Sequence, residues 1–188
     1  MTFDAVIVCG GTGRRLGGMD KAAVVVGGRT LLERAAAAVA GARRTIAVGP
    51  ARATSSVVTW TQEEPPGGGP AAALEAGIGL VTAELVAVVG VDFPLLGAET
   101  IARLAASVGA ADGAILRDGA GRDQFLAGVY RTSSLRRALE ARRNRGRAMR
   151  DVVASLDLQV IVDEEAARDC DTWDAVRVAE ATLAARDT

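Results

Sequence analysis

The sequence has no histidine among its 188 residues. Histidine-based catalytic triads and histidine-ligated metal sites are therefore excluded, so any chemistry must depend on carboxylates, cations and a hard metal ion. Aromatic residues make up only 3% of the chain, and the formal net charge is −1. These values argue against a nucleic-acid partner, which would require stacking surfaces or a strongly basic face.

Cysteines and long apolar runs are also scarce. Cys9 and Cys170 form no Cys-x-x-Cys pair, and we interpret both as reduced thiols, with Cys9 a small buried apolar side chain. No apolar run approaches the roughly 20 residues that span a bilayer, and the first residues, MTFDAVIV, lack the pattern of a secretory signal. The sequence therefore predicts a cytoplasmic protein without a membrane contact.

Short apolar runs alternate with segments of helical periodicity, and the connections between them are short. We expect strands at residues 3–8, 45–48, 57–60, 85–89, 113–116, 124–130 and 158–162. We expect helices at residues 31–40, 70–80, 100–108, 133–143, 144–156 and 173–185. Such alternation is typical of an α/β fold with a parallel sheet, and the length favours a single domain over residues 1–188.

The most informative segment is the loop CGGTGRRLGGMDK, residues 9–21, which follows a continuous apolar run. Five glycines fall within nine residues of it, and Arg14, Arg15 and Lys21 add three cations. Bare backbone amides and fixed positive charge at the carboxyl end of a buried strand are what a polyphosphate requires. The segment predicts a phosphate-binding loop.

Two familiar phosphate loops do not fit this segment. A dinucleotide fingerprint starting at Gly11 would need a glycine at position 16, which is Leu16. A P-loop spanning Gly13 and Gly18 would need a lysine next, and Met19 stands there.

Asp92 follows the most hydrophobic expected strand, in the segment VDFPLL. A carboxylate at the carboxyl edge of a parallel sheet lies where ligands bind, and a buried charge needs a partner. A magnesium ion on substrate phosphates would supply one, since Mg²⁺ is typically held by one or two carboxylates with phosphate oxygens and waters. The alternative is that Asp92 caps the turn before Pro94.

The segment GGTGRRLGGMDK resembles the signature loop of the molybdenum cofactor guanylyltransferases, Leu-Ala-Gly-Gly-x-x-x-Arg-Met-Gly-x-x-Lys. Val8 and Cys9 replace the Leu-Ala pair, and Leu16 replaces the methionine. The resemblance implies a MobA-like nucleotidyltransferase with a three-layer, Rossmann-like (glycosyltransferase-A-like) fold. In this fold a mostly parallel central sheet carries helices on both faces.

The resemblance also implies the site residues. The catalytic residues would be Arg15, Lys21 and Asp92, and the metal ligands Asp92 and Asp171. The nucleotide would be bound by Val8, Cys9, Gly10, Gly11, Thr12, Gly13, Arg14, Arg15, Lys21, Gly49, Glu63, Gly69, Pro70, Asp92 and Asp171. Asp171 stands in Asp-Cys-Asp-Thr, which resembles the family's Asn-x-Asn/Asp-Thr-Pro motif; a helix cap, together with Thr172, is the alternative role.

The segment around Gly69 and Pro70 resembles the family's Gly-Pro-Leu-x-Gly motif, which lies against the guanine base. Ala71 and Ala73 replace the Leu and the second Gly, so the base preference stays open between GTP and CTP. Glu63 falls where the family has a nucleotide-contacting acid, and the neighbouring Glu64 is the alternative.

The implied activity is magnesium-dependent transfer of GMP from GTP to the terminal phosphate of molybdopterin, with release of pyrophosphate. Molybdoenzyme-maturation proteins are the further partners that the resemblance implies. The alternatives are a cytidylyltransferase, a transferase acting on a sugar or lipid phosphate, and a non-catalytic nucleotide-binding protein. Gln124 and a cluster of arginines are candidates for contact with the second substrate, although a solvated helix face is favoured for the cluster. Its members are Arg136, Arg137, Arg142, Arg143, Arg145, Arg147 and Arg150.

Overall fold

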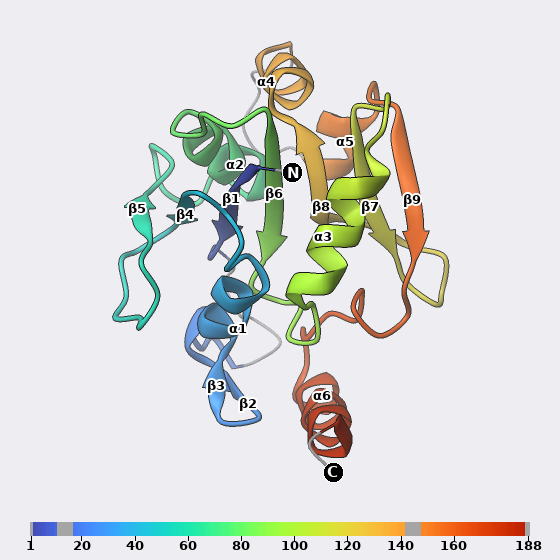
Figure 1. Ribbon diagram of the computed structural model, residues 1–188. Helices are drawn as coiled ribbons and strands as arrows, with labels where there is room; N and C mark the ends of the chain where they lie inside the picture. The colour runs from blue at the N-terminus through green and yellow to red at the C-terminus, as the bar shows by residue number, and fades with distance from the viewer. Residues whose placement is uncertain (1, 11–16, 142–147, 187–188) are drawn as a thin grey trace.

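The computed structural model describes residues 2–10, 17–141 and 148–186. Its centre is a seven-stranded sheet with the strand order β5-β4-β1-β6-β8-β7-β9 (Figure 1). The strands are β1 (Phe3–Val8), β4 (Thr45–Val48), β5 (Thr59–Thr61), β6 (Leu85–Gly90), β7 (Gly113–Arg117), β8 (Asp123–Arg131) and β9 (Leu158–Val162). The most hydrophobic of the expected strands, β6, lies at the centre of the sheet.

The sheet is parallel except for β8, which pairs antiparallel with both β6 and β7. The connection from β7 to β8 has only the residues 118–122, which is too short for the crossover that a parallel neighbour needs. The mostly parallel sheet is therefore confirmed, with one strand reversed by a hairpin.

Helices cover both faces of the sheet, as predicted. In Figure 1, α1 (Leu31–Ala38) and α3 (Ala98–Ser107) lie in front of it, and α2 (Pro70–Ile78), α4 (Thr132–Glu140) and α5 (Met149–Val153) lie behind. Consecutive residues of β1 enter opposite cores: Ala5 and Ile7 pack with α1 and α3, whereas Val6 and Val8 pack with α2 and α4. Burial on both faces explains the continuous apolar run in this strand.

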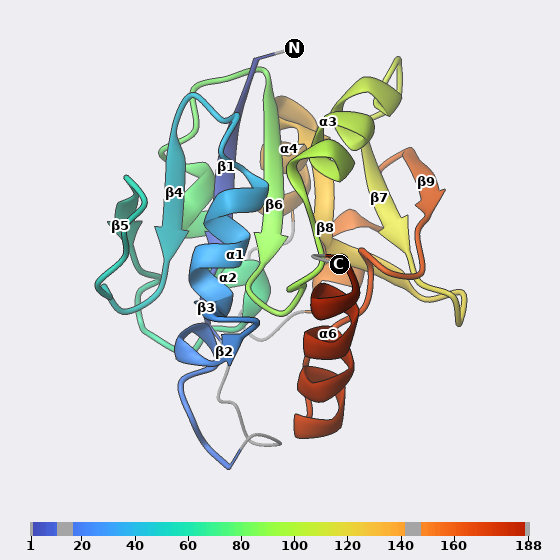
Figure 2. The same cartoon turned by 60° about the horizontal axis from the view of Figure 1, so that its bottom comes forward.

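The carboxyl ends of the parallel strands point towards α6 (Trp173–Arg186) and a small hairpin of β2 (Val25–Val26) and β3 (Arg29–Thr30), as Figures 1 and 2 show. The hairpin turns at Gly27 and Gly28, in a segment where the sequence analysis expected no strand. Thr30 then caps α1 in a reciprocal capping box with Glu33.

Several predicted boundaries were wrong by a few residues. Helix α1 ends at Ala38 and α2 at Ile78, each two residues early. Strand β5 is displaced along the chain, because pairing with the short β4 begins only at Thr59, and Val57 is 97% exposed. A helix was expected at residues 144–156, and in the described part of this range the helix α5 covers Met149–Val153.

Helix α2 lies unusually close to the sheet. A side chain at Gly77 would place its Cβ 2.6 Å from Val6 Cγ1 and 2.9 Å from Val48 Cγ2, distances that real Cβ atoms do not adopt. Glycine and the surrounding alanines thus allow the helix backbone to contact β1 and β4. This close packing fixes the amino end of α2 at the carboxyl edge of the sheet. Among the helices described, none has both the length and the apolar character needed to cross a bilayer.

Candidate functional site

The ends of β1 and β4 lie side by side at the carboxyl edge. Val8 pairs with Val48 on one side and with Gly90 of β6 on the other. Gly49 follows β4 with a φ of 139°, and a Cβ there would contact Cys9 Cβ at 3.4 Å. The structure therefore brings together Val8, Cys9 and Gly49, three predicted nucleotide-binding residues.

Cys9 is fully enclosed by this packing. Its Sγ lies 3.7 Å from the Ile7 carbonyl oxygen, and burial raises the pKa of the thiol to about 12. A thiol with this pKa is protonated and unreactive at neutral pH. The side chain is an apolar filler, in agreement with the prediction.

Lys21 joins the two predicted metal ligands. Its ammonium Nζ lies 3.5 Å from Asp92 Oδ2 and also bonds Asp171 Oδ1, although these acids are 71 and 150 positions away. The lysine residue is only 8% exposed. One buried cation therefore lies between two carboxylates that come from different elements of the fold.

Local structure holds Lys21 in place. It is the first residue of a short 3₁₀ helix, η2 (Lys21–Ala23), and Ala22 and Val24 next to it are buried in the core. The preceding Asp20 caps this helix, since its Oδ1 accepts from Ala22 N–H at 3.2 Å. The end of the glycine loop is thus attached to the core beside α1.

Asp92 lies two residues after the end of β6, and its side chain is 27% exposed, so the carboxylate is only partly buried. Burial raises the pKa of Asp92, an effect that the Lys21 ammonium only partly offsets. For Lys21 burial acts to lower the pKa, but the charges of Asp92 and Asp171 outweigh it, and its pKa lies above the usual value. Lys21 is therefore charged at neutral pH.

Asp171 lies at the start of α6, where the sequence left two roles open. The cap bond comes from the next residue, because Thr172 Oγ1 accepts from Ala175 N–H at 3.2 Å. Asp171 instead reaches Lys21 with Oδ1. The hydroxyl caps the helix, and the carboxylate joins the charged cluster.

The charge arrangement fits the hard metal ion that the resemblance implies. Asp92 and Asp171 converge on one cationic atom, so both carboxylates can reach a shared positive charge. Within residues 2–10, 17–141 and 148–186 no group of three or more His, Cys, Asp or Glu side chains could hold a metal by itself. Two carboxylates suffice for Mg²⁺, which takes its remaining ligands from water and substrate phosphates.

Gly90 is a residue of this site that sequence reasoning missed. A Cβ at this position would lie 2.2 Å from Asp92 Oδ1, so the carboxylate occupies the space that a side chain would fill. The available signal was a glycine that interrupts a run of β-branched residues, which often marks a close approach in a strand.

The amino end of α2 forms another wall of the edge. Gly69 is the N-cap, with a φ of 85° and no side chain to bond the free amides of this end, and Pro70 follows at the first helical position. Glu63 Oε1 accepts from Gly67 N–H at 3.0 Å and closes the turn before the helix. Glu64 is exposed. A nucleotide contact for either acid stays a prediction.

Several predicted residues lie outside the described part of the chain. These are Gly11, Thr12, Gly13, Arg14 and Arg15 of the loop, and Arg142, Arg143, Arg145 and Arg147 of the basic cluster. Gly10 is described and exposed. Arg136 donates to the carbonyl oxygens of Ile78 and Val81 at 3.0 and 2.6 Å, a structural link between α4 and the end of α2.

Gln124 lies at the base of the β7–β8 hairpin. Its Nε2 donates to Asp118 Oδ2 at 3.2 Å, and Arg122 Nε donates to the same oxygen at 2.7 Å. The amide therefore has a partner within the hairpin, and contact with a second substrate stays a prediction.

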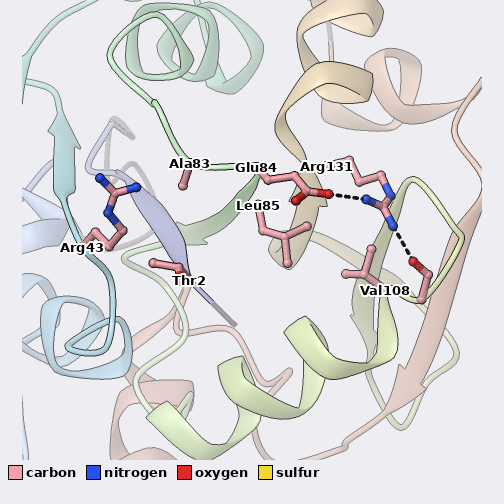
Figure 3. A pocket seen from close by; sticks show the side chains of 8 residues that line it. Thr2, Arg43, Ala83, Glu84, Leu85, Val108 and Arg131 are labelled. Carbon is pink, nitrogen blue, oxygen red and sulfur yellow. Dashed lines mark hydrogen bonds and ion pairs between the residues drawn. The ribbon is translucent and has the colours of Figure 1, made fainter.

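A pocket of about 270 Å³ lies at the opposite, amino-terminal edge of the sheet (Figure 3). Its Arg131 donates to Glu84 Oε1 at 2.8 Å and to the Gly109 carbonyl. The Arg131 guanidinium is thus already paired with a carboxylate of the same pocket. The glycine loop, Lys21 and the two carboxylates make the carboxyl edge the candidate site.

A lysine and two acids at the carboxyl edge of a mostly parallel sheet, after a glycine-rich sequence, are the arrangement expected of a Rossmann-like nucleotidyltransferase. The sequence agrees with this class. Residues 5–162 match the model of the MobA-like NTP transferase domain, and the chain belongs to that family. No curated protein matches the sequence.

Solved structures with the same fold include proteins of different activities. Molybdopterin-guanine dinucleotide biosynthesis protein A from Archaeoglobus fulgidus is 20% identical, with 97% of this chain and 99% of that chain covered and a TM-score of 0.76. The 2-C-methyl-D-erythritol 4-phosphate cytidylyltransferase from Thermus thermophilus is 19% identical, with 98% and 100% covered and a TM-score of 0.77. A nucleotidyl transferase from Methanothermobacter is 18% identical, with 98% and 99% covered and a TM-score of 0.78. At these identities the likeness shows the fold, and it leaves the substrates open.

Proposed function

We propose that this chain transfers GMP from GTP to the terminal phosphate of molybdopterin and releases pyrophosphate. The observation that carries the proposal is the position of Lys21 between Asp92 and Asp171, at the end of a loop with the guanylyltransferase signature. A binding protein would need the lysine for phosphate but would not need two acids around it. The cluster therefore supports catalysis over binding alone.

In the proposed reaction an oxygen of the acceptor phosphate bonds to the α-phosphorus of GTP, and the bond from that phosphorus to the pyrophosphate oxygen breaks. The chain supplies positioning and charge rather than a covalent nucleophile, which agrees with the absence of histidine and the inert Cys9. The amides of the glycine loop, with Arg15 and Lys21, would hold the triphosphate.

Asp92 and Asp171 would hold the magnesium ion, which when bound neutralises the charge of the transferring phosphates. Lys21 keeps the two carboxylates together before substrate binds, because its ammonium pairs with both. A triphosphate offers this ammonium a stronger set of acceptors. With Lys21 on the triphosphate, Asp92 and Asp171 would be the residues that hold the ion.

A cytidylyltransferase is the second candidate, because Ala71 and Ala73 stand where the guanylyltransferase pattern has Leu and Gly. Both alanines are buried in the core between α2 and the sheet, at 9% and 3% exposure. They alter the packing of the first turn of α2 and add no polar group that would select cytosine. We therefore favour guanine. In this role the chain would act in the cytoplasm and supply molybdoenzyme-maturation proteins with the finished cofactor.

The test is a panel of nucleotides and acceptors. GTP, CTP and ATP compete for the purified protein, and pyrophosphate release is then followed with molybdopterin or with 2-C-methyl-D-erythritol 4-phosphate as acceptor. We expect GTP to bind at least about tenfold better than CTP or ATP, which corresponds to about 1.4 kcal/mol. A preference for CTP would move the chain to the cytidylyltransferases. Nucleotide binding without turnover of any acceptor would indicate a binding protein.

A further inference from the structure

Asp20, the residue before Lys21, is held by an arginine from another part of the sheet. Arg52 follows β4, and its Nη2 donates to Asp20 Oδ1 at 2.8 Å while its Nε donates to Asp20 Oδ2. This is a two-point contact between planar groups, a geometry that strengthens an ion pair and fixes its orientation. Arg52 lies outside every motif discussed above, and Asp20 has no role in the function proposed above.

Arg52 is itself fixed at the edge of the site. Its Nη1 donates to the Pro50 carbonyl at 2.7 Å, and its side chain is only 19% exposed. A Cβ at Gly49 would lie 3.6 Å from this Nη1, so the guanidinium packs against the backbone that follows β4. The arginine therefore fixes Asp20 relative to the end of β4.

Asp20 in turn restrains the short helix that begins at Lys21. The Oδ1 that accepts from Arg52 also accepts from Ala22 N–H, and the Asp20 carbonyl accepts from Ala23 N–H at 3.0 Å. The orientation of η2, whose first residue is Lys21, thus depends on Asp20. Within the part of the chain that the structure describes, the other hydrogen bonds of Asp20 are those of one short helical turn.

We infer that the Asp20–Arg52 pair is a positioning device, which holds η2 so that the Lys21 ammonium lies between Asp92 and Asp171. The role of Lys21 in turnover rests on the function proposed above, whereas the positioning itself does not. A displacement of about 1 Å at a phosphate-binding group reduces turnover by up to about 100-fold. Neither Arg52 nor Asp20 needs to contact the substrate for this effect.

The first experiment measures positioning without any substrate. Amide hydrogen exchange is followed by mass spectrometry in the peptide that contains Ala22 and Val24, for wild type, Arg52→Ala and Arg44→Ala. Arg44 is the matched control, an exposed arginine beside β4 whose contact is the Leu80 carbonyl at 3.0 Å. We expect exchange at least about tenfold faster in Arg52→Ala and unchanged in Arg44→Ala. Wild-type protection in a folded Arg52→Ala protein would overturn the inference.

Two further variants keep the test decisive. Asp20→Asn retains a cap for η2 but loses the charge, and Arg52→Lys retains the charge but loses the two-point contact. If Arg52→Ala does not fold, the amides of the Ala22 and Val24 peptide should still exchange faster than wild type in both conservative variants. Protection equal to wild type in both would contradict the inference.

The second experiment separates positioning from direct contact with substrate. We expect kcat/KM for pyrophosphate release to fall about 10- to 100-fold in Arg52→Ala, and to fall no further when Arg52→Ala is added to Lys21→Ala. A full additional loss in the double variant would show that Arg52 acts on the substrate itself, against our inference. If wild type releases no pyrophosphate, the proposed function fails, while hydrogen exchange still decides the positioning role.

Discussion

The Asp92 carbonyl oxygen accepts a hydrogen bond of 2.8 Å from the Cys170 N–H, which joins the end of β6 to the segment before α6. Asp92 is itself one partner of this bond, and Asp171 is the residue after the other partner, Cys170. The bond therefore holds the backbones of the two acids close together. The two carboxylates are therefore fixed relative to each other by the backbone, and Lys21 enters between them from the glycine loop.

Lys21→Ala should lower turnover about 30- to 1000-fold, because one charge-assisted contact to a phosphate is worth about 2–4 kcal/mol in the transition state. The sequence predicted Lys21 as a cation of a phosphate-binding loop. The structure adds a second effect, since the lysine is buried and its loss leaves two carboxylates facing each other.

We therefore expect the nucleotide-free Lys21→Ala protein to bind Mn²⁺ more tightly than wild type, and to gain thermal stability when the ion is added. Calorimetric titration and melting curves with and without Mn²⁺ measure this. Normal turnover in a well-folded Lys21→Ala protein would contradict the role of the lysine in phosphate binding.

Gly90→Ala should displace the Asp92 carboxylate, because the new Cβ would lie 2.2 Å from Oδ1. We expect kcat to fall about 10- to 100-fold while the melting temperature changes by only a few degrees, since a rotated side chain relieves the clash. Gly97→Ala is the matched control, because its Cβ would have no neighbour within 4 Å. Equal activity of the two variants would show that the position of Asp92 Oδ1 is unimportant.

Asp4→Asn should destabilise the protein by about 1–3 kcal/mol at pH 7, because Asp4 is fully buried and its Oδ2 accepts from the N–H groups of Thr82 and Ala83 at 2.7 and 2.9 Å. Burial acts to raise the pKa of Asp4, but these hydrogen bonds outweigh it, and the pKa lies below the usual value.

A lowered pKa in the folded state means that the contribution of Asp4 is present above about pH 4 and is lost as the pH falls further. The difference in unfolding free energy between wild type and Asp4→Asn should therefore narrow below pH 4. Urea unfolding at several pH values measures this, and a difference that does not vary with pH would count against it.

The sequence predicted those elements whose signal is local. Strands β1, β4 and β9 have the predicted bounds, because apolar residues of a short buried or paired strand end abruptly at turn residues. Strand β5 was misplaced, since its limits follow from pairing with β4 rather than from its own residues. The antiparallel direction of β8 follows from the short turn between β7 and β8, whereas the residues of β8 itself do not distinguish a parallel from an antiparallel strand.

At the site, the residue types were predictable and their contacts were not. Asp92 was identified from its place after a buried strand, and Lys21 from the glycine loop. That Lys21 pairs with both acids depends on chain segments up to 150 positions apart. Arg52 was missed because its role follows from the orientation of another side chain, to which local sequence patterns are insensitive. Gly90 was missed although a glycine inside a run of β-branched residues is a local signal of close approach.

Magnesium-dependent pyrophosphate release by Asp92→Asn tests the central claim most directly. The amide keeps the size of the side chain and removes the charge that pairs with Lys21 and that would hold the metal. We expect most of the activity and its magnesium dependence to be lost, and the melting temperature without nucleotide to stay the same or rise. Asn would serve nearly as well as Asp in a turn cap, so the two roles give opposite results. An active, magnesium-dependent Asp92→Asn protein would contradict the account.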